Sequence, residues 1–106
     1  MTQIYSGSEW YRSRPELEKQ WRGVLQKRDA PVGPATRDAL KYVLITEDSQ
    51  LPVYAANVEQ QLAPFVGHQV LVNGKLVGLA NEGFGQELWI GSIKAIESDK
   101  QFLNKK

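Results

Sequence analysis

Few side chains in this sequence have the type and spacing that catalysis or metal binding requires. There is no cysteine and only one histidine, His68, which follows Gly67 where a predicted helix gives way to a strand. Glu47 and Asp48 stand in a predicted polar turn, and no His, Asp and Glu residues have the spacing of metal ligands. Ser92 has no base at a spacing that would activate it. We therefore expect no catalytic residue, metal site or cofactor, and we predict that the protein is not an enzyme.

The side chains that could bind a ligand are basic and aromatic. Residues 10–41 contain eight Arg or Lys against four Asp or Glu, and residues 42–68 contain none against three. Such a basic excess attracts phosphate groups, because nucleic-acid affinity rests largely on the release of counterions. The pI of about 8.0 is nevertheless lower than the value above ~9 that is typical of dedicated DNA-binding domains. A solvated surface is the simpler interpretation of this asymmetry.

Length and composition are those of one globular domain. The chain has 106 residues, of which 42% are hydrophobic and 24% charged, enough apolar material for one core. No segment approaches the ~20 apolar residues that span a bilayer, and the start of the chain lacks the pattern of an export signal. Together with the absence of cysteine, this predicts a cytoplasmic protein without membrane contact.

The elements that would position the basic and aromatic residues begin with a short N-terminal helix. Ser13 could cap it, Pro15 suits its first turn, and Leu17 and Trp21 fall on one face before Gly23 ends it. Trp21 fits either this helix or the extended segment that follows. We divide the chain into an N-terminal extension with this helix (1–20), a barrel domain (21–98) and a polar C-terminal tail (99–106).

Extended segments follow in the pattern of a barrel. Residues 24–27 look extended, a Pro- and Gly-containing loop covers 29–40, and residues 41–46 and 51–55 form a predicted hairpin. Pro52 cannot donate to a ladder, which places the second of these strands at or near a sheet edge.

A short amphipathic helix and two longer strands complete the pattern. Asn57 is a plausible N-cap, and Gly67 closes the helix after about two turns. Asn73-Gly74 admits a type I′ hairpin turn or a bulge with Gly74 at positive φ. We favour the bulge, because barrel closure needs a coiled strand and residues 87–96 supply a better return strand.

This order of three strands, a helix and two strands resembles the oligonucleotide/oligosaccharide-binding (OB) fold, as does the segment 62–77. Many OB domains have a helix that ends in glycine, then a strand with the pattern matched by Val70, Val72, Gly74 and Leu76. The resemblance covers about three quarters of the chain and is closest to small bacterial OB-like domains, including uncharacterised and tRNA anticodon-binding-like groups. It implies an all-β, five-stranded OB-like Greek-key barrel.

The resemblance also implies where a ligand would bind. OB domains bind ligands across their second and third strands, between the loops that here cover residues 29–40 and 80–86. Basic side chains there could contact phosphates, and aromatic side chains could stack on bases. The candidate ligand-binding residues are Arg22, Arg37, Lys41, Tyr42, Tyr54, Phe84 and Trp89.

Two functions remain as hypotheses. The first is weak binding of single-stranded nucleic acid, favoured by the early basic excess and by the resemblance. The second is a protein-interaction or assembly module, with a homodimer as one form, in which an exposed barrel strand or the segment 10–21 contacts a partner. The apolar hairpin and the near-neutral charge favour the second hypothesis. Convergence of the basic residues beside Tyr42 and Tyr54 would support nucleic acid, and their dispersal would support protein contacts.

Overall fold

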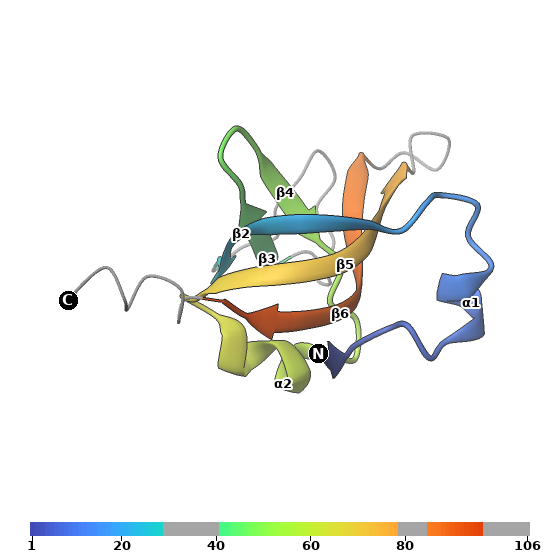
Figure 1. Cartoon of the computed structure of the whole chain (residues 1–106), viewed down its shortest axis with the longest axis horizontal. Helices are drawn as coiled ribbons and strands as arrows, with labels where there is room; N and C mark the ends of the chain where they lie inside the picture. Colours follow the sequence, from blue (N-terminus) through green and yellow to red (C-terminus); the bar gives the residue numbers. More distant parts are fainter. Residues whose placement is uncertain (29–40, 79–84, 97–106) are drawn as a thin grey trace.

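The computed structural model describes residues 1–28, 41–78 and 85–96, and its centre is a closed five-stranded β-barrel (Figure 1). The strands run in the order β2–β3–β4–β6–β5, and β5 returns to β2. All neighbours are antiparallel except β4 and β6, which are parallel. The predicted all-β barrel is therefore confirmed. Its strands are β2 (Lys19–Lys27), β3 (Tyr42–Ile45), β4 (Gln50–Val53), β5 (Gln69–Gly78) and β6 (Gln86–Ala95).

The two longest strands, β5 and β6, carry the irregularity that curves the barrel. Asn73 pairs with Ser92, whereas Gly74 pairs with Ile90, so Gly91 is the extra residue. The prediction of one long strand, in place of a hairpin at Asn73-Gly74, is confirmed, but a bulge at Gly74 with positive φ is wrong: among the described glycines only Gly67 has positive φ. The bulge lies in the partner strand, which leaves Gly74 an ordinary ladder residue.

The short helix between β4 and β5 is confirmed, with a different beginning. α2 (Glu59–Leu62) continues into the 3-10 turn η1 (Ala63–Phe65), and Leu62 is fully buried. Val58 occupies the N-cap position without a side-chain cap, so the predicted cap at Asn57 is wrong. Asn57 instead has φ of 64°, the left-handed conformation that asparagine tolerates.

The N-terminal helix forms earlier than predicted. α1 is Glu9–Arg12, and Trp21 belongs to β2, whose pairing with β5 begins at Lys19. A helix through Trp21 is therefore wrong, because the backbone bonds and burial that the ladder supplies outweigh a modest local helix preference. Before α1, the short strand β1 (Thr2–Gln3) pairs with β6 on the C-terminal side of the bulge in β6.

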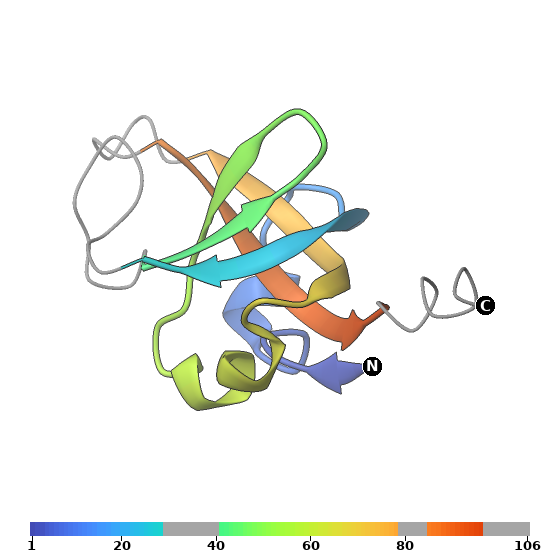
Figure 2. The same cartoon turned by 90° about the vertical axis from the view of Figure 1, so that its left-hand side faces the viewer.

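The N-terminal segment, residues 1–18, packs on the barrel rather than standing apart from it (Figures 1 and 2). The amides of Ile4 and Ser6 both donate to the carbonyl oxygen of Gly91, at 2.8 and 3.1 Å. Tyr5 and Tyr11 are buried in the same hydrophobic cluster as the barrel residues. The bulge at Gly91 thus lies where the N-terminal segment docks.

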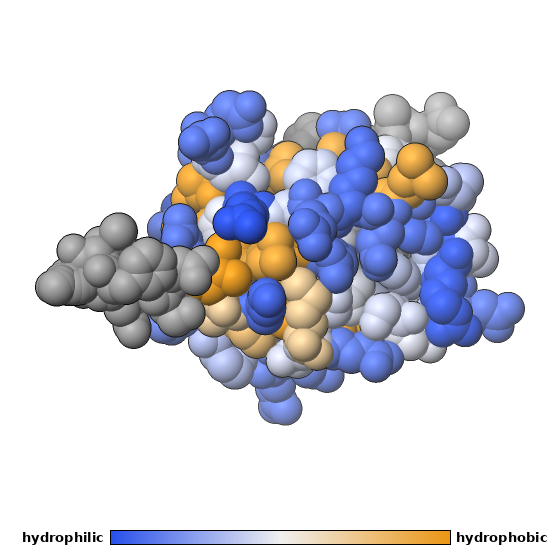
Figure 3. Space-filling model, in the orientation of Figure 1, coloured by the Kyte–Doolittle hydropathy of each residue, from blue (hydrophilic) through white to orange (hydrophobic). Residues whose placement is uncertain are grey.

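Inward-facing residues of all five barrel strands form the core, and Leu62 closes it from the helical side. On the face seen in Figure 3, apolar residues are interspersed with polar ones. No helix in the described ranges is long and apolar enough to cross a membrane. Fully buried members of the core include Leu25, Leu44, Val53, Val70, Val72, Leu88, Ile90 and Ile93.

Candidate ligand-binding surfaces

Two of the predicted stacking residues, Tyr54 and Trp89, lie side by side. Tyr54 directly follows β4, and its amide donates to the carbonyl oxygen of Leu88 on β6 at 3.0 Å. The parallel pairing of β4 and β6 thereby brings the rings of Tyr54 and Trp89 to a centroid distance of 5.3 Å, tilted by 30°. Both side chains are half-buried and pack against the core.

Two aromatic residues of the N-terminal segment join this pair. The Trp10 ring lies 5.3 Å from Trp89 and 6.4 Å from Tyr54, in edge-on geometry. Tyr5 lies 4.8 Å from Trp10, and its hydroxyl donates to the carbonyl oxygen of Ala56 at 2.7 Å. We call Tyr5, Trp10, Tyr54 and Trp89 the aromatic cluster. Trp10 remains 45% exposed and is its most accessible member.

Charged groups border the aromatic cluster. The guanidinium of Arg14 lies 5.4 Å from the centre of the Trp89 ring and forms an ion pair with Glu16 at 2.8 Å. The bonds from Arg14 lower the pKa of the Glu16 carboxyl. The Trp89 indole also donates to the buried Glu87 at 3.2 Å. These contacts hold the Trp89 ring in one orientation.

The other predicted site residues do not join the aromatic cluster. Tyr42 is only 2% exposed and burial raises its pKa, so it is a core residue and not a stacking platform. Lys41 lies at the start of β3, where its carbonyl oxygen accepts a bond from the Arg28 amide. Arg22 is exposed on β2. Arg37 and Phe84 lie outside the described residues. Arg22 and Lys41 therefore do not converge beside Tyr42 and Tyr54, and this dispersal is the outcome that favours protein contacts over nucleic acid.

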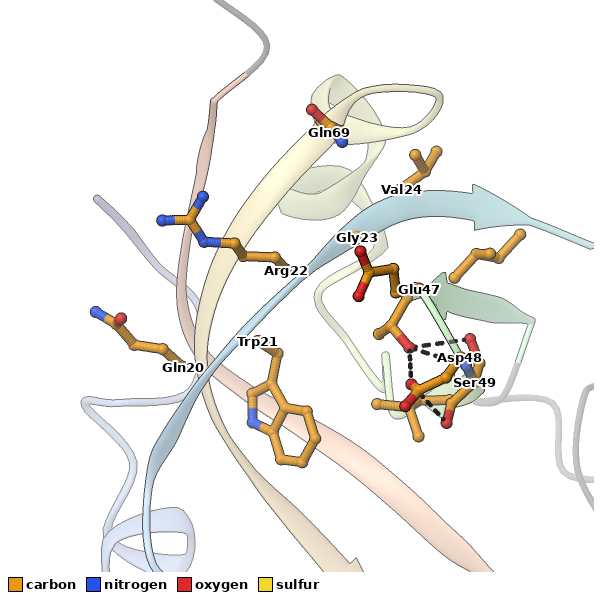
Figure 4. Close-up of a pocket in the computed structure, with 12 residues that line it drawn as sticks. Gln20, Trp21, Arg22, Gly23, Val24, Glu47, Asp48, Ser49 and Gln69 are labelled. Atoms are coloured by element: carbon orange, nitrogen blue, oxygen red, sulfur yellow. Dashed lines mark hydrogen bonds between the residues drawn. The ribbon is translucent and has the colours of Figure 1, made fainter. Parts of the chain in front are cut away.

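A second surface is an open groove of about 600 Å³ between β2 and the β3–β4 hairpin (Figure 4). The ring of Trp21 turns towards this groove, and its indole donates to the carbonyl oxygen of Gly74 at 3.2 Å. Arg22 points away from the hairpin. We call this space the hairpin groove. Its lining residues are Gln20, Trp21, Arg22, Gly23, Val24, Ile45, Thr46, Glu47, Asp48, Ser49, Leu51 and Gln69.

The polar turn of the hairpin forms the far wall of the groove. The Ser49 amide donates to the hydroxyl oxygen of Thr46 at 3.0 Å, and the hydroxyls of Thr46 and Ser49 both donate to Asp48. These bonds fix the turn that the sequence predicts. The side chains of Glu47 and Asp48 remain exposed at its tip.

No protein-family model matches the chain, and comparison with curated proteins and with solved structures finds no match either. Within the described part of the chain, no three His, Asp or Glu residues gather as a metal site would require. What the domain binds must therefore follow from the aromatic cluster and the hairpin groove.

Proposed function

We propose that this protein is an OB-like binding module that takes single-stranded nucleic acid on its aromatic cluster. The strand order of the barrel is compatible with an OB fold, and Tyr54 follows the strand that would be third in that fold. The carrying observation is the proximity of Trp10, Tyr54 and Trp89, with ring centroids 5.3–6.4 Å apart. Every base has a π-face, so an accessible aromatic surface binds bases with little sequence preference.

One arginine over the Trp89 ring and a second on the helix that carries Trp10 favour a polyanion over a neutral ligand. Arg14 lies over Trp89, and Arg12 is exposed in the last turn of α1, two residues from Trp10. Arginines beside stacked aromatics both neutralise phosphates and interact with rings. The dispersal of Arg22 and Lys41 counts against a surface that follows the phosphate backbone, so the proposal rests on the aromatic cluster. We accordingly expect stacking to provide more of the affinity than counterion release.

The test is a titration of a fluorescein-labelled oligothymidine at low salt, followed by anisotropy. Trp10→Ala should weaken binding by about 5- to 150-fold, because one base–aromatic stack contributes ~1–3 kcal/mol. Leu17→Ala is the matched control, since Leu17 is an apolar side chain that is 76% exposed and belongs to no ring contact. A plot of log affinity against log salt concentration should have a slope no steeper than about −1.4, the value expected for two phosphate contacts with a single strand.

No anisotropy change at high protein concentration would overturn the proposal. So would equal affinities of the Trp10→Ala and Leu17→Ala variants. Tyr54→Ala then tests whether the inner ring contributes, with circular dichroism confirming that this half-buried position still supports the fold.

A further inference from the structure

The first half of β2 has one unpaired edge. β2 pairs with β5 from Lys19 onwards but with β3 only from Val24 onwards. On the N-terminal side of Val24, the β3–β4 hairpin diverges from β2, as Figure 2 shows. A stretch of about five residues therefore has a neighbouring strand on one side only, and the other side faces the hairpin groove.

The direction of the backbone bonds identifies the unpaired groups. The Leu25 amide donates to His68, on the β5 side, whereas the Arg28 amide donates to Lys41, on the β3 side. Bonding directions alternate along a strand, so even-numbered residues of β2 face β3 and the hairpin. The N–H and C=O groups of Gln20 and Arg22 consequently point into the hairpin groove, where no described strand pairs with them.

Side chains around this edge provide an apolar surface and negative charge. The half-buried ring of Trp21 and the side chain of Leu51 line the groove near the barrel. Glu47 and Asp48 are exposed on the opposite wall, and neither forms an ion pair with a described cation. A strand edge that no described strand pairs with, beside an apolar surface and carboxylates that pair with no described cation, has the features of a β-augmentation site.

We propose that the hairpin groove binds an extended peptide segment of a partner protein, which adds a strand to the free edge of β2. The segment would carry an apolar side chain for Trp21 and a basic side chain for Glu47 and Asp48. The carboxylates favour a basic peptide and repel a phosphate backbone, so this site is separate from the one proposed for nucleic acid. At ~3.3 Å per residue, the free edge suits a segment of four to six residues.

The experiment titrates the full-length protein with two fluorescein-labelled hexapeptides, one of alternating Lys and Val and one of alternating Glu and Val. We expect the Lys/Val peptide to bind and to shift the NMR amide signals of Gln20 and Arg22 and the indole signal of Trp21. Equal binding of both peptides would overturn the assignment, as would amide shifts confined to the aromatic cluster.

Two variants separate the contributions of charge and backbone pairing. The double variant Glu47→Gln with Asp48→Asn should weaken the Lys/Val peptide about tenfold, whereas Glu59→Gln, an exposed carboxylate on α2, should leave binding unchanged. Arg22→Pro removes an amide that the barrel does not use and should abolish binding while the fold persists by circular dichroism. Unchanged affinity in the folded Arg22→Pro variant would overturn strand addition.

A second copy of this chain is the competing occupant. Spectra recorded over a dilution series without peptide distinguish it, because self-association through β2 would shift the Gln20 and Arg22 amides with protein concentration. A constant spectrum with monomeric light scattering supports a partner peptide, and a concentration-dependent shift at these amides would overturn that assignment.

Discussion

At the scale of single residues, Lys75 joins the N-terminal segment to the barrel. It lies on β5 with only 7% of its surface exposed, and its ammonium donates to the carbonyl oxygens of Tyr11, Arg12 and Arg14 at 2.9, 3.4 and 3.0 Å. The same ammonium lies 4.8 Å from the centre of the Tyr11 ring. One charged group thus satisfies carbonyls at and beyond the end of α1, where a positive charge is favourable.

Replacing this ammonium should therefore destabilise the whole domain. Lys75→Met keeps the aliphatic stem but leaves the carbonyls without their donor, and we expect a loss of about 1.5–3 kcal/mol in the free energy of unfolding. Urea denaturation followed by circular dichroism measures it. Lys94→Met, at an exposed position of β6, should change stability by less than ~0.5 kcal/mol. Equal effects of the two substitutions would show that the Lys75 contacts contribute nothing.

Tyr11 should make the stability depend on alkaline pH. Burial, followed by its hydroxyl bond to Glu18 at 2.8 Å, raises the pKa of Tyr11 well above its usual value. The unfolded chain loses this proton at about pH 10 while the folded chain keeps it, so stability falls as pH rises above ~10. Melting temperatures of the wild type and Tyr11→Phe, compared from neutral to alkaline pH, should show a shallower decline in the variant. A parallel decline would exclude this contribution.

At the scale of elements, Gly23 allows β2 to approach β3 closely at the point where the hairpin groove begins. A Cβ atom at this position would lie 2.3 Å from the carbonyl oxygen of Ile45 and 2.9 Å from its carbon. Those are backbone atoms of the adjacent strand and cannot move aside without shifting the hairpin. The absence of a side chain at Gly23 therefore allows β2 and β3 to approach closely just before they separate around the hairpin groove.

Gly23→Ala should consequently lower stability by about 1–3 kcal/mol, the usual effect of overpacking a tight contact. Gly78→Ala is the matched control, because a Cβ atom at the exposed end of β5 would meet no atom of the described residues within 4 Å. Thermal unfolding of both variants measures the difference. If Gly23→Ala is as stable as Gly78→Ala, the hairpin accommodates the methyl group and its position is not fixed by this contact.

The barrel elements were predictable from sequence because their signals are local. Runs rich in apolar, β-branched and aromatic residues indicate β3, β5 and β6, and glycine at 67 marks the end of the helical segment. The N-terminal segment was not predictable in this way. Ser13, Pro15 and Glu16 are good local helix signals, yet the backbone ladder with β5, 47 to 55 residues further along the chain, makes residues 19–23 a strand.

In the candidate site, the residue types were predictable from the sequence, but their arrangement in space was not. Tyr54 and Trp89 were selected for their residue type, and the parallel pairing of β4 with β6 brings them together. Trp10 was missed as a ligand-binding residue because only the folded chain places it beside Trp89. Tyr42 was selected on the same grounds as Tyr54, but its ring faces the core. Residue type alone cannot distinguish these two positions, since β-strand tyrosines occur on either face.

At the scale of the whole molecule, the N-terminal segment and the barrel share one core. Tyr5 is 4% exposed and packs with residues from both parts, and its hydroxyl donates to Ala56, 51 residues along the chain. Small domains in which every part contributes to one core unfold cooperatively. We therefore expect residues 1–18 to unfold together with the barrel rather than before it.

Urea denaturation observed by tryptophan fluorescence and by far-ultraviolet circular dichroism tests this expectation. Both signals should change at one urea concentration. Trp10 packs against Trp89 of β6, so the fluorescence changes when the N-terminal segment leaves the barrel, whereas the circular dichroism reports the strands. Tyr5→Phe, which loses only the hydroxyl bond, should lower stability by about 1 kcal/mol, and Tyr5→Ala by about 3–5 kcal/mol, with the two signals still coincident. A fluorescence change at a lower urea concentration than the loss of the strand signal would contradict this expectation. The N-terminal segment would then detach while the barrel remains folded, and the contacts of Tyr5 would stabilise the segment alone.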